Sequence, residues 1–247
     1  MPKIAAEVCA NSVQSAIEAQ KGGAARVELC DNLEEGGTTP SLSQIELTRK
    51  YLNIRVNIII RPRGGDFLYD DLEFEIMKKD IHHCGQAKCD GVVFGILNAD
   101  GSVDKQRNKE LVTIAHQYGM STTFHRAFDR AVNLSESLED IIGLGFDRVL
   151  TSGGMKNAPD GKEILRKLIG QADDRIIIMP GGGITENNIG DLVRATGLKE
   201  FHGSFRSRYR GKMEYISDTF NDIDEEYSFL FSDSEKIKLA IENANKA

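Results

Sequence analysis

The sequence lacks several features that would place the chain in a special class of protein. It contains no Trp and only 5 Pro among 247 residues, and no stretch approaches 18 uncharged apolar residues. A membrane-spanning helix needs a run of about that length, so no membrane association is expected. The N-terminal run MPKIAAEVCANS has too short an apolar segment for a secretory signal. We therefore expect a cytoplasmic protein.

Cysteine and clustered charge are also scarce. The four cysteines are Cys9, Cys30, Cys84 and Cys89, and no two of them form a CxxC pair. Their spacing excludes the commonest zinc and thioredoxin-like motifs, and a cytoplasmic location predicts reduced thiols. The formal net charge is -7 and no block of five like charges occurs, so nucleic acid is not an expected partner.

What the sequence does contain is one pattern repeated eight times, a short β-branched run followed by a stretch of helical period. The eight strand runs begin at Lys3, Ala25, Arg55, Asp90, Met120, Asp147, Arg175 and Lys199. Strict alternation of strand and helix gives a parallel sheet, and eight units over most of a chain favour a closed barrel over an open doubly wound sheet. The sequence predicts an α/β protein, a single-domain (β/α)₈ TIM barrel over residues 1–247.

One segment interrupts the pattern. Residues 207–231 are predicted to be an irregular insertion before a C-terminal helix that begins near Ser232. The Tyr and Phe residues of this insertion predict packing on the barrel rim or on another subunit, and we expect a homo-oligomer. Three further helix starts are predicted, at Ser43 with Glu46, at Asp70 with Glu73, and at Thr185 with Glu186.

Alternation along the strands places polar residues on one face. The polar face of the predicted strands carries Glu7, Cys9, Arg26, Glu28, Cys30, Asn57, Arg61, Thr123, His125, His202 and Ser204. The opposite face is mostly apolar, as with Val8, Val27 and Ile58. In a barrel the apolar set packs against the helices and the polar set lines the interior, whereas an open sheet would bury those charges without partners.

Several runs of the sequence resemble the CutC family. They include EVCANSVQSAIEAQKGGAARVELC from Glu7, IIIRPRGGDFLYDD from Ile58, TFHRAFD from Thr123, IIIMPGGGI from Ile176 and FHGSFR from Phe201. The resemblance covers most of residues 4–206. It implies a (β/α)₈ barrel, a cytoplasmic location and a role in copper homeostasis, and it brings no established reaction.

The copper hypothesis depends on Cys9 and Cys30. Both end neighbouring strands on the inward face, and a level register would put their Cα atoms about 5 Å apart. Two thiolates at that spacing suit Cu(I), a soft ion, and His125 or His202 offers a further ligand. The alternative is that both cysteines are small buried hydrophobic residues. Cys84 and Cys89 are expected to be inert.

The rival hypothesis is an enzyme. Five residues are predicted to converge on the mouth of the barrel and to carry acid–base catalysis: Glu7, Glu28, Arg61, His125 and His202. The structural alternative is that the charged residues only form an ion network that fills the barrel, comprising Glu7, Arg26, Glu28 and Arg61.

Glycine-rich loops extend the enzyme hypothesis to a small anionic or phosphorylated substrate. Loops after strands seven and eight of such barrels commonly bind phosphate, although glycines also simply permit tight turns. The predicted anion-binding residues are Ser152, Gly181, Gly182, Gly183, Ser204 and Arg206, with Arg126 and Asp129 at the same rim. Arg63 and Asp66 are further candidate substrate- or anion-binding residues, in a loop that covers the mouth; the alternative is that they form a structural ion pair.

Overall fold

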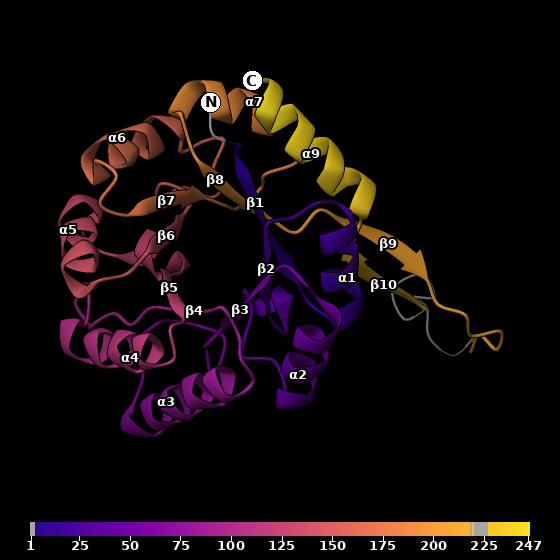
Figure 1. Ribbon diagram of the computed structural model, residues 1–247, viewed down its shortest axis with the longest axis horizontal. Coiled ribbons are helices and arrows are strands. Elements are labelled where there is room, and N and C mark those ends of the chain that lie inside the picture. The colour runs from indigo at the N-terminus through magenta and orange to yellow at the C-terminus, as the bar shows by residue number, and fades with distance from the viewer. Residues whose placement is uncertain (1–2, 218, 220–226) are drawn as a thin grey trace.

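Eight parallel strands form a barrel surrounded by helices in the computed structural model, which describes residues 3–217, 219 and 227–247 (Figure 1). The strands are β1 (Ala5–Ala10), β2 (Arg26–Leu29), β3 (Arg55–Ile59), β4 (Gly91–Phe94), β5 (Ser121–Phe124), β6 (Arg148–Thr151), β7 (Ile177–Pro180) and β8 (Glu200–Gly203). They pair in chain order, β1 also pairs with β8, and a bridge from Gly181 to His202 joins the last two units. The predicted (β/α)₈ barrel is confirmed.

Helices cover the outside of the barrel. They are α1 (Val13–Lys21), α2 (Leu42–Tyr51), α3 (Asp71–Gln86), α4 (Lys105–Gln117), α5 (Leu134–Leu144), α6 (Lys162–Ala172), α7 (Ile189–Thr196) and α9 (Ser234–Lys246). Two short 3₁₀ turns, Leu33–Glu35 and Arg126–Arg130, follow β2 and β5. No helix in the described part of the chain is long and apolar enough to cross a membrane.

The predicted alternation of polar and apolar faces is confirmed. Outward-facing strand residues such as Val8, Val27 and Phe201 are fully buried in one large apolar cluster shared with the helices. Glu7, on the opposite face of β1, is also fully buried. The barrel therefore has an apolar outer core and a polar inner one, and the inner one must supply its own charge partners.

A chain of alternating charges fills the lower interior. Arg26 donates from Nε to Glu7 at 2.5 Å and from Nη2 to Glu200, and Arg148 donates to Glu200 at 2.9 Å. The network predicted from the sequence was therefore right about Arg26 with Glu7. It omitted Glu200 and Arg148 and was wrong about Arg61, which donates to backbone carbonyls and to none of these carboxylates.

The capping residues in the sequence predict some helix starts correctly and others incorrectly. Asp70 and Glu73 form the predicted capping box at the start of α3. The prediction at Ser43 was wrong, because Ser41 caps α2 by accepting from the Gln44 amide. The prediction at Thr185 was also early, since α7 begins at Ile189 after a tight turn. The last helix begins at Ser234, close to the predicted position.

The prediction of an irregular insertion at 207–231 was wrong for its two ends. Strands β9 (Arg206–Arg210) and β10 (Ser228–Ser232) pair antiparallel and project from the barrel (Figure 1). We call this pair the β9–β10 arm. Residues 218 and 220–226 of the predicted insertion lie outside the described residues.

Aromatic stacking holds the β9–β10 arm together. The Tyr209 and Phe231 rings are parallel with centroids 3.8 Å apart, and Phe229 stacks beside them. The base of the arm is tied to the barrel, because the Ser232 amide donates to Ser15 Oγ and the Asn11 side chain donates to the Leu230 carbonyl. Cross-strand aromatic pairs stabilise such ribbons, so the period-two pattern of SRYR and SFLFS signals strands.

Replacing Arg26 with Met should strongly destabilise the fold, because Glu7 and Glu200 would remain buried without their shared cation. Removing one partner of a buried ion pair costs about 3–5 kcal/mol. Urea unfolding followed by circular dichroism measures the loss. Arg166→Met is the control, since Arg166 is exposed and Glu163 is its one ion-pair partner among the described residues. Equal effects of the two substitutions would contradict a structural role for the inner network.

Candidate functional site at the barrel mouth

A cavity of about 540 Å³ opens at the carboxyl ends of the strands. Of the residues predicted for the site, its lining includes Cys9, Glu28, Arg61, His125, Arg126, Gly182, Gly183, His202, Ser204 and Arg206. Loops that follow strands of a parallel barrel meet at this end, so residues far apart in the sequence converge. The predicted residues Glu7, Cys30, Arg63, Asp66, Asp129, Ser152 and Gly181 lie outside the lining.

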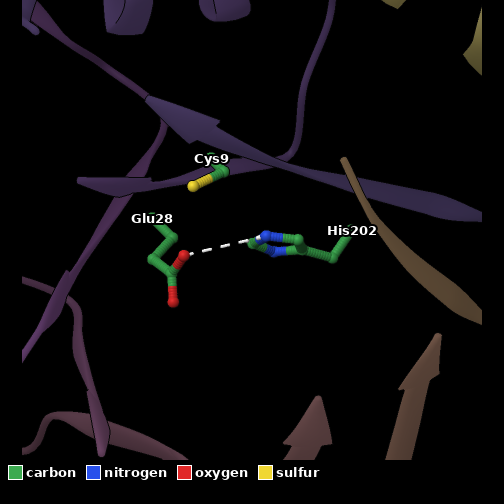
Figure 2. A group of neighbouring side chains, drawn as sticks. All are labelled: Cys9, Glu28 and His202. Carbon is green, nitrogen blue, oxygen red and sulfur yellow. Dashed lines mark ion pairs between the residues drawn. The ribbon is translucent and has the colours of Figure 1, made fainter. Parts of the chain in front are cut away.

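Three side chains meet at one wall of the cavity, as Figure 2 shows. Cys9 on β1, Glu28 on β2 and His202 on β8 bring one potential ligand atom each within 4.8 Å of the others. Strand register causes this convergence, because Cys9 pairs with Glu28 and Glu7 pairs with His202. His202 Nε2 lies 3.7 Å from Glu28 Oε2 and Nδ1 lies 2.8 Å from Glu7 Oε1.

The carboxylates around His202 decide its charge. Burial alone would lower the pKa of His202, but its hydrogen bonds with Cys9 and Glu7 and the charges of Glu28 and Glu7 raise that pKa well above its usual value. Burial likewise opposes ionisation of Glu7, yet Arg26 and His202 lower its pKa to about 2. The pKa of Glu28 is raised, chiefly by burial. At neutral pH the wall therefore carries an imidazolium held by an ionised Glu7.

The two cysteines meet across a staggered register. A level register would have paired Cys9 with Cys30, but Cys9 pairs with Glu28, and the Cys30 amide donates to the Ala10 carbonyl. The sulfurs nevertheless lie 3.3 Å apart. A hydrogen bond with Cys30, then burial and nearby negative charge, raises the pKa of Cys9. Cys9 borders the cavity, whereas Cys30 is fully buried behind it.

His125 lies on the other side of the mouth as a neutral imidazole. It is 3% exposed, its Nδ1 accepts from the Ala127 amide, and its ring packs edge-on against Phe67. Burial, with the charge of Arg61, lowers the pKa of His125 to about 3. Its Nε2 has no hydrogen-bond partner among the described residues. His125 is thus a polar group directed at the site by apolar packing.

Arg61 is held in place by the backbone. Its guanidinium donates to the carbonyls of Glu35, Gly37 and Gly65 and lies 5.0 Å from the centre of the Phe67 ring. Because none of these partners carries a charge, Arg61 contributes a net positive charge to the cavity wall. The predicted place of Arg61 at the mouth agrees with its position in the cavity lining.

The loop after β3 favours the structural alternative for Arg63 and Asp66. These two side chains form an ion pair at 3.0 Å, and Arg63 also donates to Glu73 at 2.6 Å. Arg63 further donates to the Leu68 carbonyl. The pair therefore closes the loop upon itself, and neither residue lines the cavity.

Asp129 is used to build the loop after β6. Its carboxylate accepts from the Thr151 hydroxyl and from the amides of Ser152 and Gly154. Arg126 pairs with Asp129 at 3.2 Å and lines the cavity. Ser152 donates to the Met155 carbonyl. Of this group, Arg126 is the residue that reaches the cavity.

Three glycines shape the loop after β7. Gly182 and Gly183 have φ of +93° and +71°, a region that side chains rarely adopt. A Cβ on Gly181 would lie 2.5 Å from the Leu150 side chain, so this position has no room for one. The amides of Gly182 and Gly183 donate to no acceptor within the described residues. The predicted loop therefore presents bare backbone at the cavity.

The sequence reasoning missed several residues of the inner network and the lining. Glu200 shares the polar face of β8 with His202, so alternation along that strand carried a signal for it. Lys236 and Glu186 line the cavity from α9 and from the turn before α7, and no local pattern marks them. Phe205 also lines it, with an unusual φ of +47°.

The two histidines of the mouth should titrate far from the ordinary value of 6.5 and in opposite directions. We expect His202 to stay protonated as pH rises above this value and His125 to stay neutral down to about pH 3. Imidazole NMR shifts against pH, assigned with His125→Gln and His202→Gln, provide the measurement. Titration of both rings near 6.5 would show that the described charges do not govern them.

The sign of the linked stability follows from these directions. The raised pKa of His202 contributes stability at acidic pH that is lost as pH rises through the folded-state pKa. The lowered pKa of His125 makes folding less favourable as pH falls from 6.5 towards about 3. His125→Gln should therefore reduce the acid sensitivity of unfolding.

Known proteins match the chain closely over the barrel. The model of the CutC family matches residues 4–207. A CutC family protein of Chromobacterium violaceum is 49% identical over 209 residues, covering 85% of this chain and 84% of that protein. The human protein named copper homeostasis protein cutC homolog is 46% identical over 209 residues, covering 85% of this chain and 76% of its own length.

A solved structure agrees with the fold. The crystal structure of a CutC protein from Streptococcus agalactiae superposes with a TM-score of 0.77 at 36% identity, covering 81% of this chain and 98% of that chain. The matched region contains all eight barrel strands and the residues of the mouth except Lys236, while most of the β9–β10 arm follows it. The chain belongs to the CutC family.

Proposed function

We propose that this protein acts in copper homeostasis by binding Cu(I) through Cys9 and Cys30. The observation that carries the proposal is the 3.3 Å distance between the two sulfurs, which lets both reach one ion. Relatives that share nearly half of the residues bear the name copper homeostasis protein, and this supports the assignment. Soft thiolate ligands select Cu(I) over harder divalent ions.

The surroundings of Cys9 fit a metal ligand better than a packing residue. Both cysteines belong to a small apolar cluster with Ile59, against which Leu33 packs, as buried hydrophobic residues would. Cys9, however, faces both Glu28 and His202, whose ligand atoms lie within 4.8 Å. Apolar packing gives no reason to place two ionisable groups beside a thiol. His202 would supply an imidazole as a third donor, and Glu28 a nearby carboxylate.

The protonation of the site sets a condition on binding. The Cys9 thiol is held protonated, and His202 is held as an imidazolium between two carboxylates. Both must lose a proton to act as ligands, so binding releases protons and strengthens as pH rises. Glu7 and Glu28 then offset the positive charge of the ion. This set of donors binds a cation most readily at neutral or alkaline pH.

The proposed location follows from the same chemistry. Four free cysteines, all buried, require a reducing compartment to remain thiols. Cu(I) is likewise the form of copper stable with thiols under reducing conditions. We therefore place the function in the cytoplasm.

Substituting either cysteine of the pair should abolish tight copper uptake. Cys9→Ser and Cys30→Ser are each expected to weaken Cu(I) binding by about a hundredfold or more, since loss of a direct ligand exceeds the usual effect of an outer-shell change. Competition with a coloured Cu(I) chelator under anaerobic conditions measures the affinity.

Cys84→Ser and Cys89→Ser are matched controls, because this second buried pair lies at the end of α3 and just after it. They should bind copper as the unmodified chain does. Uptake that survives loss of both Cys9 and Cys30, or that falls equally with Cys84, would refute the proposal.

A further inference from the structure

The charge of the mouth cavity is opposite to that of the whole chain. The protein carries a formal net charge of -7. The cavity lining nevertheless holds four cationic side chains, Arg61, Arg126, Arg206 and Lys236, against the carboxyl groups of Glu28 and Glu186 and that of Asp129, which pairs with Arg126 from outside the lining. Cations gathered in a concave wall concentrate anions from solution. A copper site at Cys9 does not account for this excess of positive charge.

The loop after β7 offers unused donors to an anion. The amides of Gly182 and Gly183 have no acceptor within the described residues. A Cβ on Gly182 would lie 3.7 Å from Arg126 Nη1, so the guanidinium lies beside this bare backbone. Backbone amides next to a guanidinium form the usual cradle of a phosphate group.

The loop after β8 is held in a costly conformation. Phe205 has a φ of +47°, which is unusual for a bulky residue. Its ring lies over Gly203, where a Cβ would come within 2.7 Å, and edge-on to Phe201. The flanking residues Ser204 and Arg206 both line the cavity. Strain of this kind persists where the surrounding structure enforces it, commonly at ligand sites.

Arg206 reaches the cavity without a partner of its own. Its side chain makes no hydrogen bond or ion pair with any residue that the structure describes. Lys236 Nζ donates to the Arg206 carbonyl at 3.1 Å and so brings a second cation to the same rim. Arg126 lies beside the loop after β7, so three cations of the cavity lining lie at the loops after β7 and β8, which we call the anion end.

Another part of the cavity lining, which we call the polar end, contains buried polar atoms without partners among the described residues. Glu28 and His125 are each 3% exposed and line the cavity from β2 and from the end of β5. Glu28 Oε1 and His125 Nε2 have no hydrogen-bond partner in the described part of the chain. Buried polar atoms are normally satisfied, so these two point to hydroxyl or carbonyl groups of a ligand.

We infer that the mouth cavity binds a small organic phosphate monoester, with the phosphate at Gly182, Arg126 and Arg206 and the rest of the ligand between Glu28 and His125. The cavity volume of about 540 Å³ suits a molecule of this size. The inference goes beyond copper binding, because its anion end lies at the loops after β7 and β8 and uses neither cysteine. Glu28 and His202 border both sites.

The test is calorimetric titration of the reduced, metal-free chain with inorganic phosphate and with glycerol 3-phosphate. Both are expected to bind, the ester more tightly because it also reaches the polar end. Arg126→Gln and Arg206→Gln should each weaken both probes by about tenfold, the usual size of one charge-assisted contact. Arg166→Gln is the charge-matched control on the exposed face of α6 and should leave binding unchanged.

A second variant separates the two ends of the site. His125→Asn should remove the advantage of glycerol 3-phosphate while keeping the affinity for inorganic phosphate, which also shows that the variant is folded. Cys9→Ser should retain phosphate binding whatever it does to copper, so each proposal can fail without the other.

Three results would overturn the inference. One is that neither phosphate probe binds at a concentration of about 10 mM, because the affinity would then be weaker than the millimolar range. Another is an equal loss of affinity in Arg166→Gln, which would show general charge attraction. The third is binding of glycerate as tightly as glycerol 3-phosphate, which would make the ligand a carboxylate and the phosphate assignment wrong.

Discussion

The fully buried carboxylate of Glu7 is the interaction on which the rest of the barrel interior depends. One oxygen accepts from Arg26 and the other lies 2.8 Å from His202 Nδ1. Arg26 also pairs with Glu200, which in turn pairs with Arg148 in the lower interior, whereas His202 lines the cavity at the mouth. A single side chain thus couples the charges that fill the barrel to the group that gives the site its chemistry. Exchanging this carboxylate for an apolar residue would take from Arg26 and His202 the carboxylate that they share, leaving Arg26 with Glu200 and His202 with Glu28.

Functional groups are divided between two sides of the mouth. The thiols come from β1 and the end of β2, and the exposed glycine backbone comes from the loops after β7 and β8. β8 lies next to β1, so His202 stands between the thiols and the glycine loops. A metal ion and an anion could not be treated as independent there, because each changes the charge that the imidazole experiences. The arrangement favours mutual influence between ligands of opposite sign.

The fold could be predicted from the sequence because polar and apolar residues alternate along each strand. This alternation shows which residues face the helices and which face the barrel interior. Apolar residues such as Val8 mark the helix side and polar ones such as Glu7 mark the interior. The same parity placed His125 and His202 at the mouth. Register could not be predicted, since it depends on how neighbouring strands shift in closing the barrel. That shift makes Glu28, and not Cys30, the register partner of Cys9, although the two sulfurs still lie 3.3 Å apart.

Other features of the site are set by contacts that leave no local trace in the sequence. Arg61 was expected among carboxylates, yet three carbonyls of neighbouring loops hold it. Asp129 was expected to contact ligand, yet it organises the loop after β6. The backbone amides and carbonyls of short loops need hydrogen-bond partners. Nearby charged side chains supply those partners and are then not available to a ligand. Charged residues at the rim of the barrel therefore indicate where a site lies, but their residue types do not show which of them contact a ligand.

The thiols of Cys9 and Cys30 differ in their access to solvent. Cys9 borders the cavity at 7% exposure, and Cys30 lies behind it with no exposed surface. Any reagent that enters from solution, whether an alkylating agent, a peroxide or a metal carrier, meets the sulfur of Cys9 first. The proposed exchange of a metal ion would consequently be sequential, because an incoming partner meets the outer sulfur before the inner one. The barrel thereby gives two chemically identical groups a fixed order of reaction.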